Sequence, residues 1–164
     1  MIRTERLVLR KPQLDDDVST FVADAEVQRW IGVDHDPAEV IQRWVRRWER
    51  NGVGQFIVEL EGEFIGRVGF VVWDARTWKT SAYDLAGKQA ETELGWAILH
   101  THWGHGYATE AAQAARDWID RDRIISLINP ENLKSQRVAE KLGAQIEGRV
   151  ETPEGPADVW VHPR

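Results

Sequence analysis

Two glycines at the start of a predicted helix are the feature of this sequence that points most directly to chemistry. The run Trp103–Ala111 reads Trp-Gly-His-Gly-Tyr-Ala-Thr-Glu-Ala; it follows an apolar stretch at 94–99 and opens a segment with helical apolar spacing. The first N–H groups of a helix have no acceptor within it, and the helix dipole adds positive charge there. Because glycine lets a ligand approach the backbone closely, the junction favours a phosphate or pyrophosphate site. A plain tight turn has the same spacing, and the run matches neither a P-loop nor a dinucleotide fingerprint.

Side chains that can accept a proton lie close to this junction in the sequence. Glu93 precedes it on a predicted strand, where alternation places it on the same face as Gly95 and Ala97. It is either a general base or a carboxylate that faces solvent or pairs with a cation. His100 and His102 are weaker choices for a base, although histidine titrates near neutrality.

A second group of polar residues opens a later predicted helix. Asn132 and Ser135 form an Asn-x-x-Ser pattern just after Pro130. This pattern is typical of a helix start, in which the asparagine caps the helix and the serine fills its first turn.

The composition of this 164-residue chain excludes several kinds of site. The absence of cysteine rules out disulfides, thiolate metal sites and a cysteine nucleophile. His100 and His102 lack evident further ligands, so loop histidines without a metal are the favoured interpretation. A net charge of −6 without a basic block argues against nucleic-acid binding and would attract a cationic amine. Apolar runs are too short to cross a membrane and no signal-peptide core is present, so we expect a cytoplasmic protein.

The remaining patterns predict one mixed α/β domain over residues 1–164. Strands are expected at 4–11, 55–60, 63–72, 91–99, 123–129, 145–151 and 157–162. Helices are expected at about 15–25, 37–52, 107–122 and 130–143, the first of them with Asp15, Asp16 and Asp17 in its N-terminal turn. Gly66 and Gly69 within a strand predict a bulge or a close backbone approach.

Three motifs, in this order along the chain, resemble those of the GNAT N-acetyltransferases. They are the opening Thr4–Arg10, the coenzyme A pyrophosphate loop Gln/Arg-x-x-Gly-x-Gly/Ala, which falls on Trp103, Gly106 and Ala108, and the segment Pro130–Gly143. The run around the two glycines resembles the branch that includes the ribosomal-protein-alanine N-acetyltransferases. The resemblance implies the GNAT acyl-CoA N-acyltransferase fold, with a mostly antiparallel central sheet flanked by helices. It also implies transfer of an acetyl group from acetyl-CoA to a primary amine, without a metal.

The resemblance further implies that backbone groups form most of the coenzyme site. The loop amides would hold the pyrophosphate, and the preceding strand would pair with the pantetheine arm, with Ile98 nearest the thioester. The residues concerned are Trp96, Ala97 and Ile98 in the strand and Trp103, Gly104, His105, Gly106, Tyr107, Ala108 and Thr109 in the loop. Trp103 stands where the resembled family usually has Gln or Arg, and His105 where Lys or Arg is common, so this loop lacks cations that the family has there.

The same resemblance implies roles for several polar side chains. Glu93 lies where several family members carry a catalytic glutamate that acts through water. Asn132 is expected to contact the pantetheine arm and Ser135 to protonate the departing thiolate. Arg137 is either a ligand of a coenzyme phosphate or a surface charge.

The acceptor side is less defined by the sequence. In the resembled family the first two helices form one wall of the acceptor pocket, where Trp30 and Trp44 are expected, and Tyr83 lies in a long predicted connection, 74–90, near the same site. This connection is either a substrate-selecting loop or a dimer contact, and the protein is a monomer or a homodimer. The acceptor is a protein N-terminus, a polyamine, an amino acid or an aminoglycoside-like amine. A non-catalytic acyl-CoA-binding module and an unrelated phosphate-binding α/β protein are the alternatives.

Overall fold

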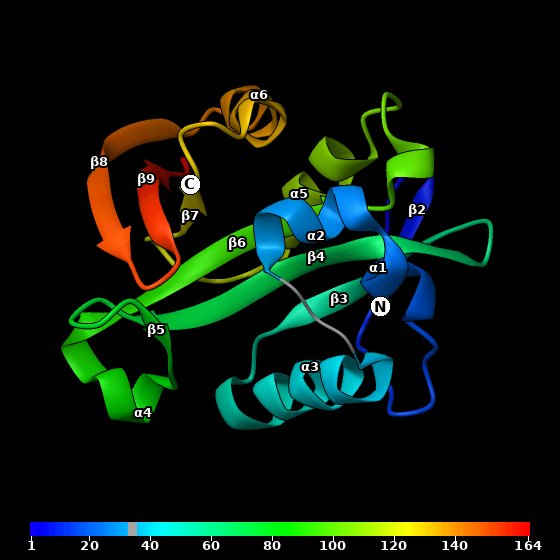
Figure 1. The fold of residues 1–164 in the computed structure, drawn as a ribbon, viewed down its shortest axis with the longest axis horizontal. Helices are drawn as coiled ribbons and strands as arrows, with labels where there is room; N and C mark the ends of the chain where they lie inside the picture. The colour runs from blue at the N-terminus through cyan, green and yellow to red at the C-terminus, as the bar shows by residue number, and fades with distance from the viewer. Residues whose placement is uncertain (33–35) are drawn as a thin grey trace.

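The described strands form one mixed sheet of nine strands, shown in Figure 1 as a computed structural model that describes residues 1–32 and 36–164. The strands are β1 (Ile2–Arg3), β2 (Leu7–Arg10), β3 (Gln55–Leu60), β4 (Glu63–Asp74), β5 (Lys79–Thr80), β6 (Ala90–Ile98), β7 (Ile125–Ile128), β8 (Gln145–Thr152) and β9 (Gly155–Val161). Their order across the sheet is β1-β2-β3-β4-β6-β7-β9-β8, and β5 pairs with β4. Within the described residues the pairs are antiparallel except for β6 with β7, which are parallel. The expected mixed α/β fold with a mostly antiparallel sheet is confirmed.

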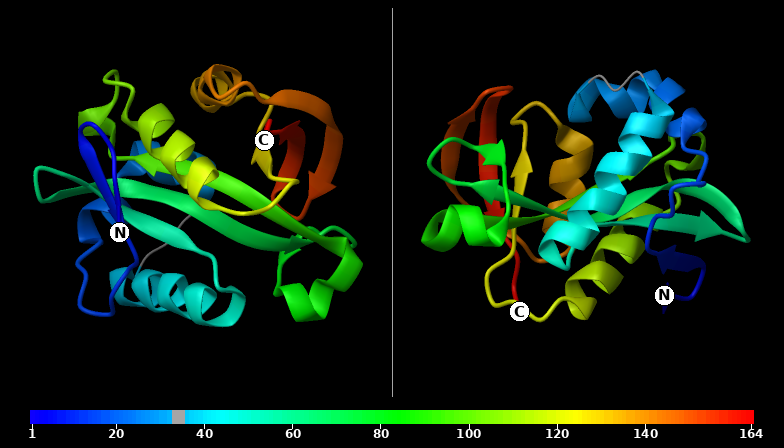
Figure 2. Two further views of the ribbon diagram at one scale, coloured as in Figure 1. Left: turned by 180° about the vertical axis from the view of Figure 1, so that it is seen from behind. Right: turned by 90° about the horizontal axis from the view of Figure 1, so that it is seen from below.

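The helices are α1 (Ser19–Ala23), α2 (Ala25–Ile31), α3 (Pro37–Asn51), α4 (Tyr83–Ala86), α5 (Tyr107–Trp118) and α6 (Leu133–Lys141), and 3-10 turns lie at Gly87–Gln89 and His100–His102. The first three cover one face of the sheet and α5 covers the other, as the view along the sheet in Figure 2 shows. α6 packs against β7 and β9 through Ala139, Ile128 and Trp160. In the part of the chain that the structure describes, no helix combines the length and the apolar character that a bilayer span requires.

Alternation of side chains gives the central strands two different faces. Val68 of β4 and Leu94 of β6 belong to the core beneath α5, together with Ala111, Ala112 and Ala115. Arg67, Gly69 and Val71 have the opposite parity and pair in register with Ala97, Gly95 and Glu93. The face beneath α1 to α3 therefore carries a charged side chain near each end, Arg67 and Glu93, with small and apolar residues between them.

Gly66 and Gly69 are required by close backbone approach, as the sequence predicted. Their φ angles are 154° and 147°, and the strand pair β3–β4 has a register shift at Val58/Glu59, beside Gly66. A Cβ on Gly69 would lie 2.3 Å from the carbonyl oxygen of Gly54, and one on Gly66 would lie 2.3 Å from that of Ala97.

The first predicted helix, at 15–25, is shorter in the structure, where α1 covers only Ser19–Ala23. The helix α2 that follows it was not predicted; it starts because the Asp24 side chain accepts hydrogen bonds from the N–H groups of Glu26 and Val27. Asp16 forms an ion pair with Arg10 rather than capping a helix, whereas Asp17 accepts a bond from the N–H of Ser19 at 2.9 Å.

The connection 74–90 is also more ordered than predicted, since it contains β5, α4 and a 3-10 turn. The predicted helix at 107–122 ends at Trp118, and the strand expected at 123–129 is shorter, at Ile125–Ile128. The helix predicted at 37–52 is confirmed, with Asp36 accepting from the N–H of Ala38 at its start and Gly52 in the left-handed conformation at its end.

Replacement of Gly69 by alanine tests the close approach. Because the new Cβ would overlap the Gly54 carbonyl at a φ that L-residues rarely adopt, Gly69→Ala should lower the free energy of unfolding by about 2 to 4 kcal/mol. Urea denaturation of the purified variant measures this change. Gly148→Ala is the control, because a Cβ there would meet nothing within 4 Å. Equal stability of the two variants would contradict the strand packing described here.

Candidate active site

A cleft of about 1050 Å³ opens between β6 and β7. The two strands pair at Glu93 and Ile125, and beyond this point residues 94–98 and 126–129 line opposite sides of the cleft. Helices α2, α3, α5 and α6 and the tip of the β8–β9 hairpin contribute further walls. The divergence of two neighbouring strands therefore creates the site.

Side chains replace strand-to-strand backbone bonds at the base of the cleft. The N–H of Leu127 donates to Oε2 of Glu93 at 2.8 Å, and the hydroxyl of Ser126 donates to the carbonyl of Leu94 at 2.6 Å. Both contacts join β6 to β7 across a gap that a backbone ladder would close. They keep buried backbone groups satisfied where the strands separate.

Glu93 is a half-buried carboxylate that faces this cleft. Its Oε1 accepts a hydrogen bond from Nε1 of Trp73 at 2.8 Å, so each carboxylate oxygen has one N–H donor. Burial raises the pKa of Glu93 above its ordinary value, against these two donors and the positive charges of Arg67 and Arg47. A carboxylate with a raised pKa in a cleft is suited to accept a proton near neutral pH.

The edge of β6 presents backbone donors to the cleft. The N–H of Leu99 donates to the carbonyl of Ile65 in β4 at 2.8 Å. Since N–H directions alternate along a strand, those of Ile98 and Trp96 point away from β4 and toward the cleft. An extended ligand could therefore pair with this edge as an additional strand.

The predicted phosphate loop has the expected backbone geometry. Gly104 and Gly106 have φ angles of 83° and 80°, and Gly106 precedes α5 with no side-chain cap. Among the residues that the structure describes, no neighbouring heavy atom lies within 4 Å of a Cβ built on Gly104, and only a guanidinium nitrogen of Arg6, at 3.7 Å, lies near one built on Gly106. The first N–H groups of α5 therefore open onto free space, as an anion site requires.

Arg6 holds this loop in place, a role that sequence reasoning missed. Its Nε donates to Glu110 at 2.7 Å, its Nη1 donates to the carbonyl of His105 at 2.9 Å, and its guanidinium lies 4.5 Å from the ring centre of Tyr107. Thr4 donates to the same Glu110 carboxylate at 2.5 Å. The opening motif at residues 4–10 contains Arg6 and could have drawn attention to it, but the sequence alone assigned this arginine no role.

Helix α6 places a row of cations along the cleft. Lys134, Arg137 and Lys141 all line it, at a spacing that puts them on one helical face. The ammonium of Lys134 lies 3.8 Å from the ring centre of Trp103, whose Nε1 donates to the carbonyl of Ile98 at 2.7 Å. Lys134 thus brings a positive charge to the position where tryptophan replaces the expected Gln or Arg.

Asn132 and Ser135 are joined to each other at the start of α6. Oδ1 of Asn132 accepts from the N–H of Ser135 at 3.3 Å, which confirms the cap, and Nδ2 of Asn132 donates to Oγ of Ser135 at 3.1 Å. Because the asparagine donates, the hydroxyl hydrogen of Ser135 remains available for another acceptor. Both residues line the cleft.

The cleft brings together most of the predicted site residues. Those that line it are Trp30, Trp44, Glu93, Trp96, Ala97, Ile98, Trp103, Gly104, Gly106, Tyr107, Ala108, Thr109, Asn132, Ser135 and Arg137. His105 is absent from the lining; its ring stacks on Tyr107. Tyr83 lies at a separate surface depression, where its hydroxyl bonds to Thr92 at 2.7 Å and Arg121 stacks on its ring at 3.9 Å.

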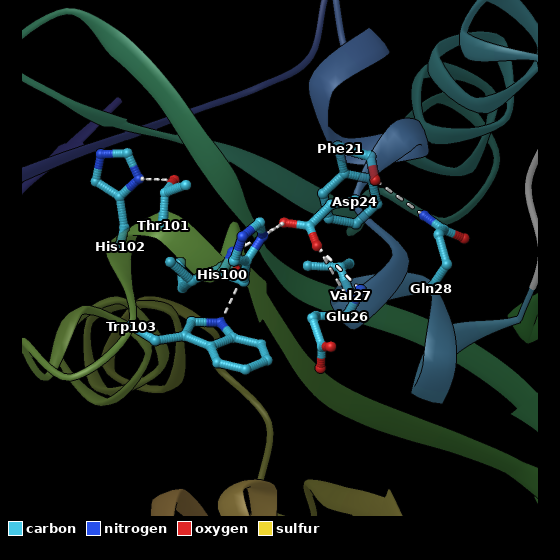
Figure 3. A network of polar contacts seen from close by, with 10 residues as sticks. Phe21, Asp24, Glu26, Val27, Gln28, His100, Thr101, His102 and Trp103 are labelled. Atoms are coloured by element: carbon cyan, nitrogen blue, oxygen red, sulfur yellow. Dashed lines mark hydrogen bonds and ion pairs between the residues drawn. The ribbon is translucent and has the colours of Figure 1, made fainter.

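The histidines before the loop do not assemble a metal site. His100 contacts Asp24 through its N–H at 2.8 Å and through Nδ1 at 2.9 Å, as Figure 3 shows. Among residues 1–32 and 36–164 there is no group of three or more His, Cys, Asp or Glu that could hold a metal ion, and His35 lies outside these residues. The Asp24–His100 contact instead connects the start of α2 to the 3-10 turn that follows β6.

His162, the residue directly after β9, contacts Ser126 of β7, which in turn contacts Leu94 of β6. Its Nε2 lies 2.7 Å from Oγ of Ser126, whose own hydrogen goes to Leu94, so Nε2 is the donor of this bond. Its Nδ1 is buried without a hydrogen-bond partner among the described residues. Burial, helped by the charge of Arg116, lowers the pKa of His162 from 6.5 to about 4.

Known proteins resemble this chain in sequence and in fold. One family model, described as Acetyltransferase (GNAT) domain, matches residues 6–145. A Bacillus subtilis protein named uncharacterized protein YkkB is 32% identical over 153 residues, which cover 85% of this chain and 82% of that protein. The crystal structure of an acetyltransferase from Agrobacterium tumefaciens is 28% identical, with a TM-score of 0.78, and the alignment covers 99% of this chain and 94% of that one. Aminoglycoside acetyltransferase AAC(6')-Ib, solved in complex with coenzyme A, shares the fold at 22% identity and a TM-score of 0.74, with 96% and 95% of the two chains covered.

The depressed pKa of His162 predicts a loss of stability in acid. Between pH 6.5 and about 4 the unfolded chain binds a proton at this residue and the folded protein does not, so stability falls as pH falls through this window. Once the pH is below about 4, the free energy of unfolding is lower by about 3 kcal/mol because of this residue. Urea midpoints measured at several pH values should therefore fall more steeply for the natural protein than for His162→Gln, whose amide keeps a donor for Ser126 and does not titrate. His105→Gln, at an exposed histidine, is the control and should retain the natural pH dependence. Parallel pH profiles of the natural protein and His162→Gln would contradict a neutral buried imidazole.

Proposed function

This chain belongs to the GNAT acetyltransferase family, and we propose that it transfers the acetyl group of acetyl-CoA to a primary amine by direct attack in a ternary complex. One observation carries the proposal: a carboxylate with a raised pKa and an uncapped helix N-terminus open onto the same cleft. The first suits deprotonation of an amine, and the second suits a pyrophosphate. The domain would comprise residues 1–164.

The coenzyme is proposed to lie between β6 and α6. The N–H groups at the start of α5 would bind the pyrophosphate, with Gly104 and Gly106 leaving room for it. The edge of β6 at Trp96 and Ile98 would pair with the amides of the pantetheine arm, near Asn132. The cations of α6, which include Arg137, would balance the coenzyme phosphates. The coenzyme A complex of the fold relative AAC(6')-Ib supports this choice of ligand.

The proposed chemistry uses groups on both walls of the cleft. Glu93, directly or through a water, takes a proton from the ammonium form of the acceptor so that the amine can attack the thioester carbon. The N–H of Ile98 polarises the thioester carbonyl as negative charge develops on its oxygen. When the carbon–sulfur bond breaks, Ser135 gives its hydroxyl proton to the leaving thiolate and regains a proton, directly or through water, from the attacking nitrogen as this becomes an amide. Asn132 holds the serine in position.

The acceptor is proposed to enter from the side of α2 and α3, where Trp30 and Trp44 line the cleft. Tyr83 is no longer part of this proposal, because α4 directs it to a different surface. We infer from the run Trp103–Ala111 that the chain lies near the ribosomal-protein-alanine N-acetyltransferases, with a protein N-terminus or a small amine as the acceptor. A cytoplasmic monomer or homodimer acting without a metal, a nucleic acid or a membrane completes the proposal.

Calorimetric titration with acetyl-CoA, followed by thiol release in the presence of amines, tests this function. Binding with amine-dependent thiol release is the expected result. Binding without turnover on any amine would favour a non-catalytic acyl-CoA-binding module instead. The absence of binding would reject the assignment of the loop.

Replacement of Glu93 by glutamine tests the base. Glu93→Gln should lower kcat at least about 100-fold, because it removes proton transfer, and should leave the affinity for acetyl-CoA nearly unchanged. The acidic limb of the natural pH–rate profile should lie above the ordinary glutamate value of 4.5, as the raised pKa requires, and should disappear in the variant. Glu91→Gln is the matched control, since Glu91 lies on the same strand outside the cleft and pairs with Arg123. An unchanged rate in Glu93→Gln would remove this residue from the mechanism.

Replacement of Arg6 by alanine tests the organisation of the loop. Loss of the bonds to Glu110 and to the His105 carbonyl should raise the Kd for coenzyme A by about tenfold, because binding must then order the loop. The value of kcat at saturating acetyl-CoA should stay within about twofold, since Arg6 does not line the cleft. Arg3→Ala, at an exposed arginine of β1, serves as the control. Unchanged coenzyme affinity in Arg6→Ala would show that the loop keeps its shape without this clamp.

A further inference from the structure

Gln55 is a buried polar residue to which the proposed reaction assigns no role. It lines the cleft, and the residue is 3% exposed. Its side-chain oxygen Oε1 is buried and has no hydrogen-bond partner among the described residues. A buried acceptor that has lost water and gained no donor lowers the stability of the folded protein. A ligand in the cleft that donates a hydrogen bond to Oε1 would remove this cost.

The backbone of Gln55 is held between α3 and the middle of the sheet. Nε1 of Trp48 donates to its carbonyl oxygen at 2.8 Å, and Gln55 pairs in register with Gly69. Residues directly opposite each other in neighbouring strands project to the same face of the sheet. Ile57, two residues further along β3, packs in the core beneath α1 to α3. The side chain of Gln55 therefore lies on this face, beneath the helices of the acceptor side.

Two glycines separate Gln55 from the edge of β6. Gly69 of β4 pairs with Gly95 of β6, so the strands β3, β4 and β6, which lie side by side in Figure 1, carry a glutamine and two glycines at one level. Among the described residues, only Nη1 of Arg67, at 3.5 Å, lies within 4 Å of a Cβ built on Gly95. The glycines therefore keep the floor of the cleft low between Gln55 and β6, with Arg67 beside it.

The proposed reaction centre lies at the other end of this row. Glu93 is two residues from Gly95 and faces the cleft. Gln55 and Gly95 are two strand spacings apart, which amounts to about 10 Å. A hydrogen bond takes up ~3 Å at each end, which leaves about 4 Å for the ligand. An acceptor that reaches both ends therefore carries its second polar group about three or four bonds from its nitrogen.

The surroundings of Gln55 favour a neutral donor over a second ammonium group. Among the described residues of α3 and β3, none of those that line the cleft is a carboxylate; they are Arg43, Trp44, Arg47 and Gln55. An ammonium that leaves water needs an anion nearby, whereas a hydroxyl or an amide N–H needs only one acceptor. The amide oxygen of Gln55 therefore matches a hydroxyl or an amide N–H.

We propose that Gln55 selects the acceptor, a primary amine with a hydroxyl or amide N–H about three or four bonds from its nitrogen, by accepting a hydrogen bond from that group. The inference rests on the proposed acetyl transfer and names its substrate class. The nitrogen lies toward Glu93, the body of the acceptor lies over Gly69 and Gly95, and the donor binds Oε1 of Gln55. An amino alcohol and the N-terminus of a peptide share this chemistry.

Matched amines test the acceptor class by thiol release from acetyl-CoA. 3-Amino-1-propanol is compared with 3-methoxypropylamine, which accepts a hydrogen bond but cannot donate one at that end, and with butylamine, which does neither. L-Alaninamide is compared with L-alanine methyl ester, which lacks the amide N–H. The member with the donor should have a kcat/KM at least about tenfold higher in at least one set, and the set concerned distinguishes a hydroxyl from an amide. 1,3-Diaminopropane should be no better than butylamine.

Replacement of Gln55 by leucine locates the binding group. Gln55→Leu should lower kcat/KM for the preferred amine about tenfold, and it should leave the matched amine without a donor and the affinity for acetyl-CoA unchanged. Because Oε1 has no partner in the free protein, the same variant should have a higher urea midpoint, whereas a structural hydrogen bond would give a lower one.

Gln28→Leu is the matched control. Gln28 is also buried, but its Nε2 donates to the carbonyl of Phe21 at 3.1 Å and it does not line the cleft. This variant should have a lower urea midpoint and keep the natural preference among the amines.

Other results would separate this inference from the function on which it rests. Equal kcat/KM within both sets, a preference for 1,3-diaminopropane, an equal loss with every amine in Gln55→Leu, or a lower urea midpoint of that variant would overturn the role of Gln55. Binding of acetyl-CoA without thiol release from any of the six amines would overturn the acceptor class and leave the coenzyme site. No binding of acetyl-CoA and no thiol release would overturn both proposals.

Discussion

The separation of β6 from β7 is the constraint on which the site depends. Two parallel strands that diverge must leave backbone N–H and C=O groups without ladder partners, and buried groups of this kind are costly. Here Glu93 and Ser126 satisfy two of them with side-chain oxygens, at 2.8 and 2.6 Å. The same carboxylate that holds the strands apart therefore faces the space that their separation creates. Ser126 in turn contacts His162, so the residue that follows β9 also stabilises the contact between β6 and β7.

The proposed phosphate loop shows how segments that are distant in the sequence hold a backbone conformation in place. Gly104 and Gly106 supply left-handed conformations and open space, but glycine also increases the conformational freedom of a loop. Arg6 offsets this freedom by binding the His105 carbonyl on one side and Glu110 on the other. On the opposite wall, Lys134 stacks on Trp103 and supplies charge from α6. Shape and charge thus come from different elements.

Among the described residues, the side chains that line the cleft include more cations than carboxylates, although the whole chain is acidic. The net charge of −6 suggested an acidic surface that would attract a cationic amine. In the folded protein, Arg43 and Arg47 from α3, Arg67 from β4 and the cations of α6 gather around one cleft. Local charge acts on a bound ligand more strongly than net charge does, because distant charges are screened by water and salt.

The sequence alone determined the elements with strong local signals and predicted the residues of the proposed coenzyme site. Spacing identified α3, Gly66 and Gly69 indicated close packing, and the glycine loop before α5 predicted an anion site, because these features depend on backbone conformation. Only the tertiary structure decided the start of α2 at Asp24, the position of Tyr83 outside the cleft, and the contacts of Arg6 and Lys134. Those outcomes rest on contacts between residues far apart in the chain, such as Arg6 with Glu110, and no local pattern records which side chain a distant segment will meet.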